Sequence, residues 1–180
     1  AYLTTLYATS IFNFLDWNSA PVFEALSLAA MFHDIGKLKL NKKLLTMKIE
    51  EMSPDEIKEY CTHPDLGAVI LGGIHGVGEI VQQIISQHHE CLDGSGFPRG
   101  IKSVKISPLA NIIGLSNRFV HYLQDEKLAP VTALEKLLRT PEQIPKYKPD
   151  IISGLVKSMA DPSRFKFSTN PVLSKKRNVR

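Results

Sequence analysis

Apolar side chains recur at helical spacing along most of this 180-residue chain, a pattern that predicts helices rather than strands. The clearest repeat runs from Val77 through Ile80 to His88, all on one helical face. Alternation typical of a strand is limited to Val104-Lys105-Ile106, so the sequence predicts an all-α bundle. Helices are expected at about residues 3–15, 21–33, 54–62, 64–72, 77–88, 107–123, 131–138 and 150–159.

Several of these helix boundaries carry capping signals. Ser53-Pro54-Asp55-Glu56 combines a capping hydroxyl, a proline in the first turn and an acid three residues after the cap. Ser107-Pro108 begins the longest expected helix in a similar way. Gly36 is expected to end the second helix, and Gly72-Gly73 the fourth. These signals support the helix assignment independently of the hydrophobic repeat.

Length and composition describe one globular unit. At 180 residues the chain is expected to form a single domain with a core at 20–125, C-terminal helices at 130–160 and a basic tail at 165–180. The net charge of +4 lies largely in that tail, which favours a solvated end over a DNA-binding site. No apolar run is long enough for a membrane segment. The chain begins without Met and without a signal peptide, so a fragment of a longer protein is expected.

The two cysteines, Cys61 and Cys91, form no closely spaced pair. Isolated thiols fit a reducing compartment, so a cytoplasmic location is expected.

The first candidate for chemistry is His33-Asp34-Ile35-Gly36-Lys37, at the end of an apolar helix. His33 falls on the buried face of that helix, and Asp34 follows at the edge of the core. Burying either group without a partner is costly, and a shared metal ion would satisfy both. A simple His-Asp hydrogen bond at a helix end is the alternative.

Three more histidines occupy similar positions. His63 precedes Pro64 at a helix start, and His88-His89 ends the amphipathic repeat. Imidazoles with one carboxylate suit first-row metals such as iron, manganese, zinc or nickel. Asp34 has two oxygens and is able to bridge two ions, with His33 on one ion and the other three histidines on the second. The alternatives are a helix-capping imidazole at His63, and one core and one surface histidine at residues 88 and 89.

Taken together, these motifs resemble the HD-GYP family of bacterial phosphodiesterases, a branch of the HD phosphohydrolase superfamily. The resemblance covers about residues 23–123 and rests on His33-Asp34-Ile35-Gly36-Lys37, His63-Pro64-Asp65-Leu66-Gly67, His88-His89-Glu90 and Gly94-Ser95-Gly96-Phe97-Pro98. It implies an HD-domain helical bundle with a binuclear centre, in which iron is the favoured metal and Asp34 the bridge. The implied metal ligands are His33, Asp34, His63, His88, His89 and Asn117.

The resemblance also implies roles at the substrate. Asp34 and Lys37 are the expected catalytic residues, and Lys37 matches the lysine that contacts the substrate phosphate in the family. The signature loop is expected to lie beside the active site and to recognise substrate and partners, through Gly96, Phe97, Pro98 and Arg99. A diguanylate cyclase (GGDEF) or another signalling domain is the partner implied for this loop. Glu90 is a candidate for orienting a ligand imidazole.

The chain departs from the family pattern at three of these positions. Phe97 replaces the signature tyrosine and removes its hydroxyl. Asn117 stands where the family has a metal-binding aspartate, so this ligand is neutral. Val120 replaces a second acid of the same helix.

The resulting hypothesis is a metal-dependent phosphodiesterase that hydrolyses cyclic di-GMP in second-messenger signalling. The alternative is a degenerate module that binds metal and nucleotide, or a partner domain, without turnover. A third hypothesis is hydrolysis of a mononucleotide or another phosphate ester.

Overall fold

A computed structural model describes residues 1–17 and 19–161, and all regular elements in these ranges are helical. The predicted basic tail at 165–180 lies outside the described residues. The all-α prediction is confirmed for the part of the chain described. The α-helices are α1 (Tyr2–Asn13), α2 (Ala20–Phe32), α3 (Pro54–Tyr60), α4 (His63–Gly72), α5 (Glu79–Gln87), α6 (Pro108–Gln124), α7 (Pro130–Arg139) and α8 (Pro149–Ala160).

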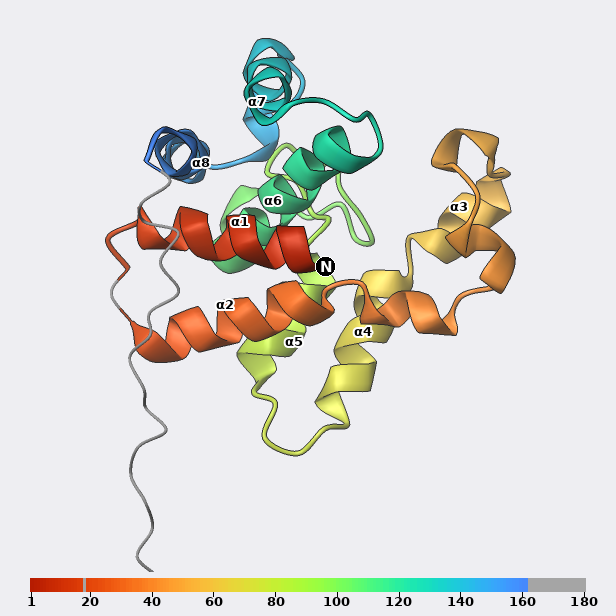
Figure 1. Ribbon diagram of the computed structural model, residues 1–180. Helices are drawn as coiled ribbons and strands as arrows, with labels where there is room; N and C mark the ends of the chain where they lie inside the picture. Colours follow the sequence, from red (N-terminus) through yellow and green to blue (C-terminus); the bar gives the residue numbers. More distant parts are fainter. Residues whose placement is uncertain (18, 162–180) are drawn as a thin grey trace, which may run out of the picture.

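Two antiparallel pairs and a central helix make up the body of the molecule (Figure 1). Helices α1 and α2 lie side by side, and α4 pairs with α5 below them. Helix α6 contacts α1 and α5, and α7 and α8 cover its other side. The core at the centre of this arrangement contains Ile11, Leu26, Ile84, Ile113 and Phe119, each with no exposed surface.

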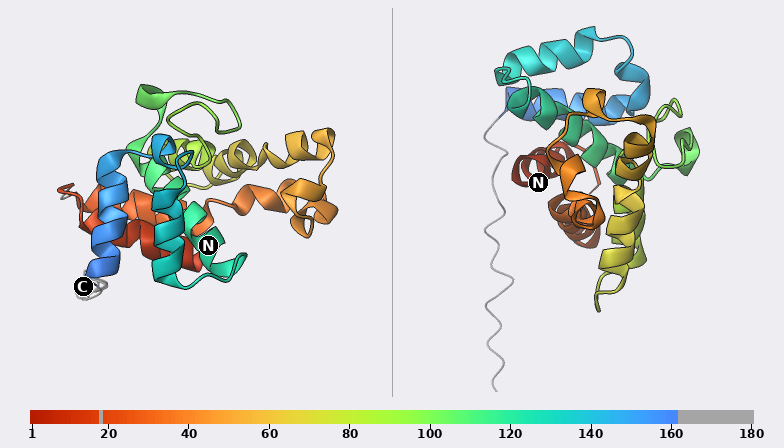
Figure 2. Two further views of the ribbon diagram at one scale, coloured as in Figure 1. Left: turned by 90° about the horizontal axis from the view of Figure 1, so that it is seen from above. Right: turned by 90° about the vertical axis from the view of Figure 1, so that its right-hand side faces the viewer.

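Residues 35–60 form an arm that projects from the body (Figures 1 and 2). The arm contains short 3₁₀ turns at Ile35–Lys39, Lys42–Leu45 and Ile49–Glu51, followed by α3. Its helix begins with the predicted capping box, in which Ser53 accepts from the Glu56 N–H and the Glu56 carboxylate accepts from the Ser53 N–H. The arm connects the end of α2 to the start of α4. These two helix ends are far apart in the sequence but lie close to each other in the body.

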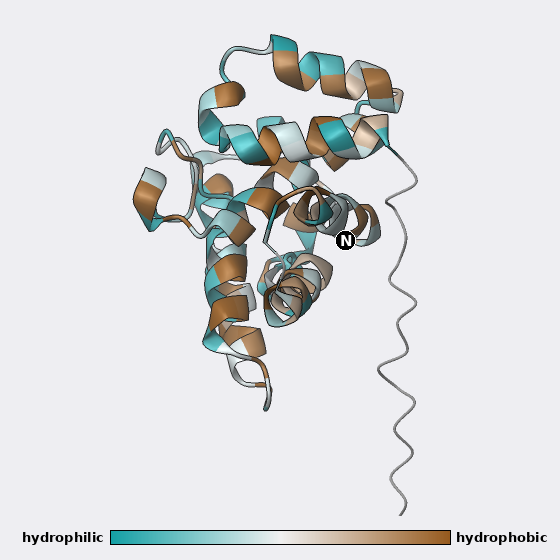
Figure 3. Ribbon diagram, turned by 90° about the vertical axis from the view of Figure 1, so that its left-hand side faces the viewer, coloured by the Kyte–Doolittle hydropathy of each residue, from teal (hydrophilic) through white to brown (hydrophobic). Residues whose placement is uncertain are grey.

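Hydrophobic and hydrophilic residues alternate around the helices as the sequence pattern requires (Figure 3). The exact buried positions differ in two helices. In α1, Thr4, Ala8 and Phe12 are buried as well as Tyr7 and Ile11, because this helix packs against α2, α6 and α8 on different sides. In α5, Ile80 is 44% exposed, because the buried face is centred on Val81, Ile84 and Ile85.

One local prediction was wrong, and one short segment with strand-like alternation is not a strand. Val104-Lys105-Ile106 overlaps a 3₁₀ turn, Ser103–Lys105, where Val104 is 95% exposed and Ile106, which follows the turn, enters the core. Gly36 does not end α2, which stops at Phe32. Gly36 instead lies in the turn Ile35–Lys39, packed directly against the first turn of α4.

The contact at Gly36 explains why no larger residue fits there. A Cβ atom at Gly36 would lie 1.9 Å from the His63 carbonyl oxygen and 2.5 Å from the Gly67 nitrogen. Both atoms belong to the backbone of α4, so a side chain could be placed only by moving the helix. The glycine therefore determines how closely the start of α4 approaches the end of α2.

We expect Gly36→Ala to lower the free energy of unfolding by about 1–3 kcal/mol, the typical effect of overpacking. The matched control is Gly73→Ala at the end of α4, where a Cβ would meet nothing closer than 3.5 Å. Urea unfolding of both variants measures the difference. Equal stability of the two variants would show that the Gly36 contact is not tight.

Candidate metal centre

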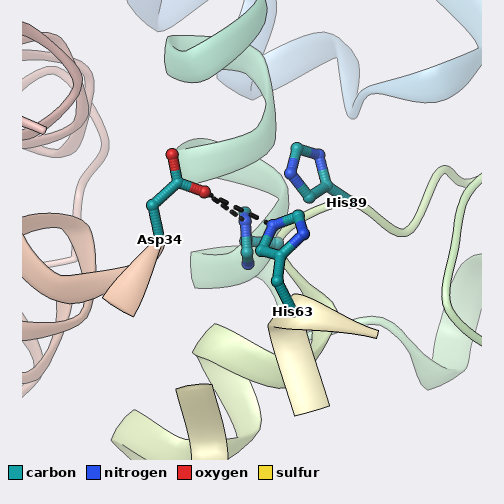
Figure 4. A group of neighbouring side chains, drawn as sticks. Asp34, His63 and His89 are labelled. Carbon is teal, nitrogen blue, oxygen red and sulfur yellow. Dashed lines mark ion pairs between the residues drawn. The ribbon is translucent and has the colours of Figure 1, made fainter. Parts of the chain in front are cut away.

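Four ligand-type side chains meet where three helices end or begin (Figure 4). Asp34 follows the last turn of α2, and His63 is the first residue of α4. His88 caps the C-terminus of α5, and His89 comes next in the chain. One nitrogen or oxygen atom from each of Asp34, His63, His88 and His89 lies within 4.8 Å of the others.

Backbone carbonyls fix the orientation of three imidazoles. The Nδ1 atom of His33 lies 2.7 Å from the Ala30 carbonyl oxygen. His63 repeats this contact with Tyr60 at 2.8 Å, and His88 with Ile85 at 2.6 Å. A carbonyl only accepts, so Nδ1 of each ring carries the proton and Nε2 presents a lone pair. This tautomer is the one in which Nε2 binds a metal.

The atoms that face one another in the cluster lack hydrogen-bond partners. Asp34 Oδ1 and the Nε2 atoms of His63, His88 and His89 are buried and make no hydrogen bond in the described part of the chain. The Nε2 atoms of His63 and His88 lie 3.3 and 3.8 Å from Asp34 Oδ1. Electron-rich atoms held this close without protons between them are costly, and a cation among them removes that cost. The residues present therefore fit a divalent metal ion.

Burial favours the neutral form of His33, His63 and His89, whereas neighbouring groups keep Asp34 ionised. Burial lowers the pKa of His33 to about 4, and it also lowers the pKa values of His63 and His89. Burial alone would raise the pKa of Asp34, but the adjacent His63 and His88 imidazoles, with His33 and Lys37, hold it well below its usual range. Neutral imidazoles and an ionised carboxylate are the protonation states that bind a metal.

The two oxygens of Asp34 face different groups. Oδ1 faces His63 and His88, whereas Oδ2 lies 3.5 Å from His33 Nε2 and 2.8 Å from Lys37 Nζ. Lys37 also lies over the Tyr60 ring, 5.3 Å from its centroid. Burial opposes the charge of Lys37, yet Asp34 and Tyr60 raise its pKa, so the ammonium group remains charged.

The loop after α5 supports the cluster from the side. The Phe97 ring stacks on His89, with centroids 4.4 Å apart and planes 25° apart. Gly96 packs against the backbone of residues 89–91 rather than standing open to a ligand, since a Cβ there would lie 2.4 Å from the His89 carbonyl oxygen. The ring of Phe97 thus fixes His89, whose imidazole has no carbonyl contact like those of the other three histidines.

Glu90 does not orient an imidazole, contrary to the prediction. Its side chain is buried, and its two oxygens accept from the backbone N–H groups of Arg99 and Ile101 at 2.8 and 3.0 Å. This carboxylate anchors the loop. The error arose because these partners are loop amides nine and eleven residues away, which no local pattern reveals.

A cavity of about 490 Å³ opens beside the cluster. Of the predicted site residues, His33, Asp34, Lys37, Phe97 and Asn117 are among those that line it, together with His88 and His89. The lining also contains residues that the sequence analysis did not select, among them Tyr60, Arg118, Tyr147 and the acids Glu50 and Asp125. Sequence periodicity does not select Arg118, which follows Asn117 directly and is therefore about 100° from it around the helix.

Gly96, Pro98 and Arg99 do not line this cavity. The Arg99 guanidinium binds Asp65 Oδ1 at 2.8 Å and the carbonyl and hydroxyl oxygens of Ser86 at 3.1 Å. Arg99 therefore ties the loop to α4 and α5.

The chain matches the family model described as the HD domain over residues 3–147. It is 27% identical over 135 residues to a cyclic di-GMP phosphodiesterase of Thermotoga maritima, covering 73% of this chain and 36% of that protein. It is also 27% identical over 140 residues to the cyclic di-GMP phosphodiesterase PA4108 of Pseudomonas aeruginosa, covering 77% of this chain and 34% of that protein. The chain thus spans about a third of the length of these relatives.

A solved structure shows the same fold. Bd1817, an HDG"Y"P protein from Bdellovibrio bacteriovorus, superimposes with a TM-score of 0.71 at 24% identity, over 88% of this chain and 51% of that one. None of the described helices is both long and apolar enough to span a bilayer.

We expect His63→Ala to reduce the bound divalent metal by at least about tenfold, because it removes a ligand with an unpaired Nε2. The matched control is His75→Ala, an exposed histidine outside the cluster. Elemental analysis of both purified variants after loading with manganese measures the difference. Full metal content in His63→Ala would remove that histidine from the ligand set.

Proposed function

The chain belongs to the HD domain family, and we propose that it contains a metal-dependent phosphodiesterase centre that hydrolyses cyclic di-GMP. The observation that carries this proposal is the set of four unpartnered ligand atoms contributed by Asp34, His63, His88 and His89. The relatives named as cyclic di-GMP phosphodiesterases support the choice of substrate. We further propose that the chain, residues 1–180, is a single domain with its core at 20–125.

We propose His63, His88, His89 and Asp34 Oδ1 as ligands of one metal ion, with His33 and Asp34 Oδ2 facing the position of a second. Iron is the proposed metal, and manganese, zinc and nickel also suit these donors. Such a pair of ions supplies Lewis-acid activation of water and neutralises phosphate charge. Asn117 is the proposed neutral ligand from α6, where it lines the same cavity.

Lys37 has a proposed role at the substrate phosphate. One of its N–H groups points to Asp34 Oδ2 at 2.8 Å, and the ammonium group is held over the Tyr60 ring. An ammonium has three donors, so the remaining N–H groups are available to a phosphate oxygen in the cavity. Asp34 thus positions Lys37 as well as serving as a ligand.

Phe97 has a positioning role in this proposal. It keeps the aromatic ring that stacks on His89, and it lacks a hydroxyl that could donate to substrate. The proposed chemistry therefore requires the ring and not a proton from this side chain. The predicted GGDEF contact of the loop at residues 96–99 stays a prediction.

We expect protein loaded anaerobically with iron or manganese to convert cyclic di-GMP into linear dinucleotide or GMP, as followed by chromatography. Asp34→Asn should lower the rate by at least about a hundredfold, because the carboxylate charge is lost. His75→Ala should retain the full rate. If the metal-loaded protein binds cyclic di-GMP but leaves it intact, the module is a sensor and not a hydrolase.

We expect Asn117→Asp to strengthen metal binding by about tenfold, since a charged oxygen replaces a neutral one at the cavity wall. Competition with a chromophoric chelator measures the affinity. Asn111→Asp on the same helix is the matched control, because Asn111 is buried away from the cavity and bonds to the backbone of Lys146 and Lys148. An unchanged affinity in Asn117→Asp would place residue 117 outside the metal site.

A further inference from the structure

Arg118 lies on the wall of the cavity, next to Asn117 on α6. It makes no ion pair within 4.0 Å and no hydrogen bond in the part of the chain that the structure describes, and its Nε atom is buried without a partner. The guanidinium N–H donors of Arg118 therefore have no acceptor among the described residues.

The position of the guanidinium group is fixed by an aromatic ring. The Arg118 Cζ atom lies 4.9 Å from the centroid of Tyr122, one helical turn further along α6. Tyr122 is only 1% exposed, so its ring is held in the core. Stacking on a buried ring orients a guanidinium without satisfying its N–H groups.

Several other basic side chains of the described residues have acidic partners. Arg99 binds Asp65, Lys43 binds Glu56 and Lys136 binds Glu126. Lys37 binds Asp34 inside the cavity itself. Of the lysine and arginine side chains that line the cavity, Lys37 is therefore paired and Arg118 is not.

The two cations stand at different places in the cavity. Lys37 contacts Asp34, whereas Arg118 acts electrostatically on Tyr147, lowering a pKa that burial raises. Helix α6 touches the cluster at Gly114, where a Cβ would lie 2.8 Å from the His88 carbonyl oxygen and 3.8 Å from the Tyr147 ring. Arg118 is four residues further on, about 6 Å along the helix axis. Arg118 thus adds a positive charge to the cavity wall one helical turn beyond the contact between Gly114 and the cluster.

We propose that Arg118 binds the second, non-reacting phosphate of a cyclic dinucleotide while the first lies at the metal-type cluster. This inference rests on the proposed function, because it assumes a substrate with two phosphates. A guanidinium offers paired N–H donors that match the two free oxygens of a phosphodiester. The approximately 490 Å³ cavity is of the size that accommodates such ligands.

A purely structural role for Arg118 predicts a different behaviour, and Lys136 provides the comparison. The Lys136 ammonium lies 5.0 Å from the centroid of the same Tyr122 ring but does not line the cavity. If Arg118 serves only to cover Tyr122, removing either cation should have similar effects. If Arg118 binds phosphate, only its removal should affect the ligand.

The experiment compares wild type, Arg118→Met, Arg118→Lys and Lys136→Met, all loaded with manganese. Calorimetric binding and hydrolysis are measured for cyclic di-GMP, and hydrolysis alone for bis(p-nitrophenyl) phosphate, which has one phosphate. Arg118→Met should raise the Kd and KM for cyclic di-GMP by about 10- to 100-fold, the range for a lost charge-assisted hydrogen bond. It should leave the KM for the single-phosphate ester within about twofold. Arg118→Lys should be intermediate, and Lys136→Met should match wild type.

Other results would contradict the phosphate contact of Arg118, the proposed hydrolysis, or both. An unchanged cyclic di-GMP affinity in Arg118→Met, or an equal loss in Lys136→Met, overturns the phosphate contact while leaving the proposed hydrolysis intact. Equal weakening with both substrates assigns Arg118 to the reacting phosphate instead. Wild type that binds cyclic di-GMP through Arg118 without hydrolysing it refutes the proposed hydrolysis alone. Wild type that neither binds nor hydrolyses the dinucleotide refutes both.

Discussion

Hydrogen bonds from three imidazoles to carbonyls of the preceding helical turn are the constraint on which the centre depends. His33, His63 and His88 each direct Nδ1 to the carbonyl three residues earlier. The rings are thereby held in one tautomer and turned so that Nε2 faces the region around Asp34. The contact is available because each histidine stands at a helix boundary or in the adjoining turn, where the local carbonyl is accessible.

This arrangement concentrates unfavourable interactions in the protein without metal. Four ligand atoms are buried without hydrogen bonds, and two of the imidazole nitrogens lie within 4 Å of a charged carboxylate oxygen. The helices are nevertheless drawn together, with Gly36 against the backbone of α4 and Gly114 against the carbonyl of His88. Packing of the apolar helix faces holds these electron-rich oxygen and nitrogen atoms close together although they repel one another. A cation bound among them would attract each of these atoms.

The sequence was sufficient for the helices and for the residues that meet in the cluster. Periodicity and capping residues identify helices because they act within one or two turns, as Ser53 and Glu56 do. The contacts that sequence reasoning did not reveal join distant segments. Gly36 packs against α4, Glu90 accepts from loop amides, and Arg99 binds Asp65. Arg118 was overlooked because its importance comes from facing a cavity, which exists only once α6 is packed beside the ends of α2 and α5.

The central claim is that Asp34, His63, His88 and His89 hold a divalent metal ion. Anomalous diffraction from crystals grown with manganese, recorded above and below its absorption edge, tests this directly. The account predicts a peak among Asp34 Oδ1 and the three Nε2 atoms, with bond lengths of about 2.0–2.3 Å. A map with no peak there, from crystals in which the four side chains keep their present positions, would contradict it.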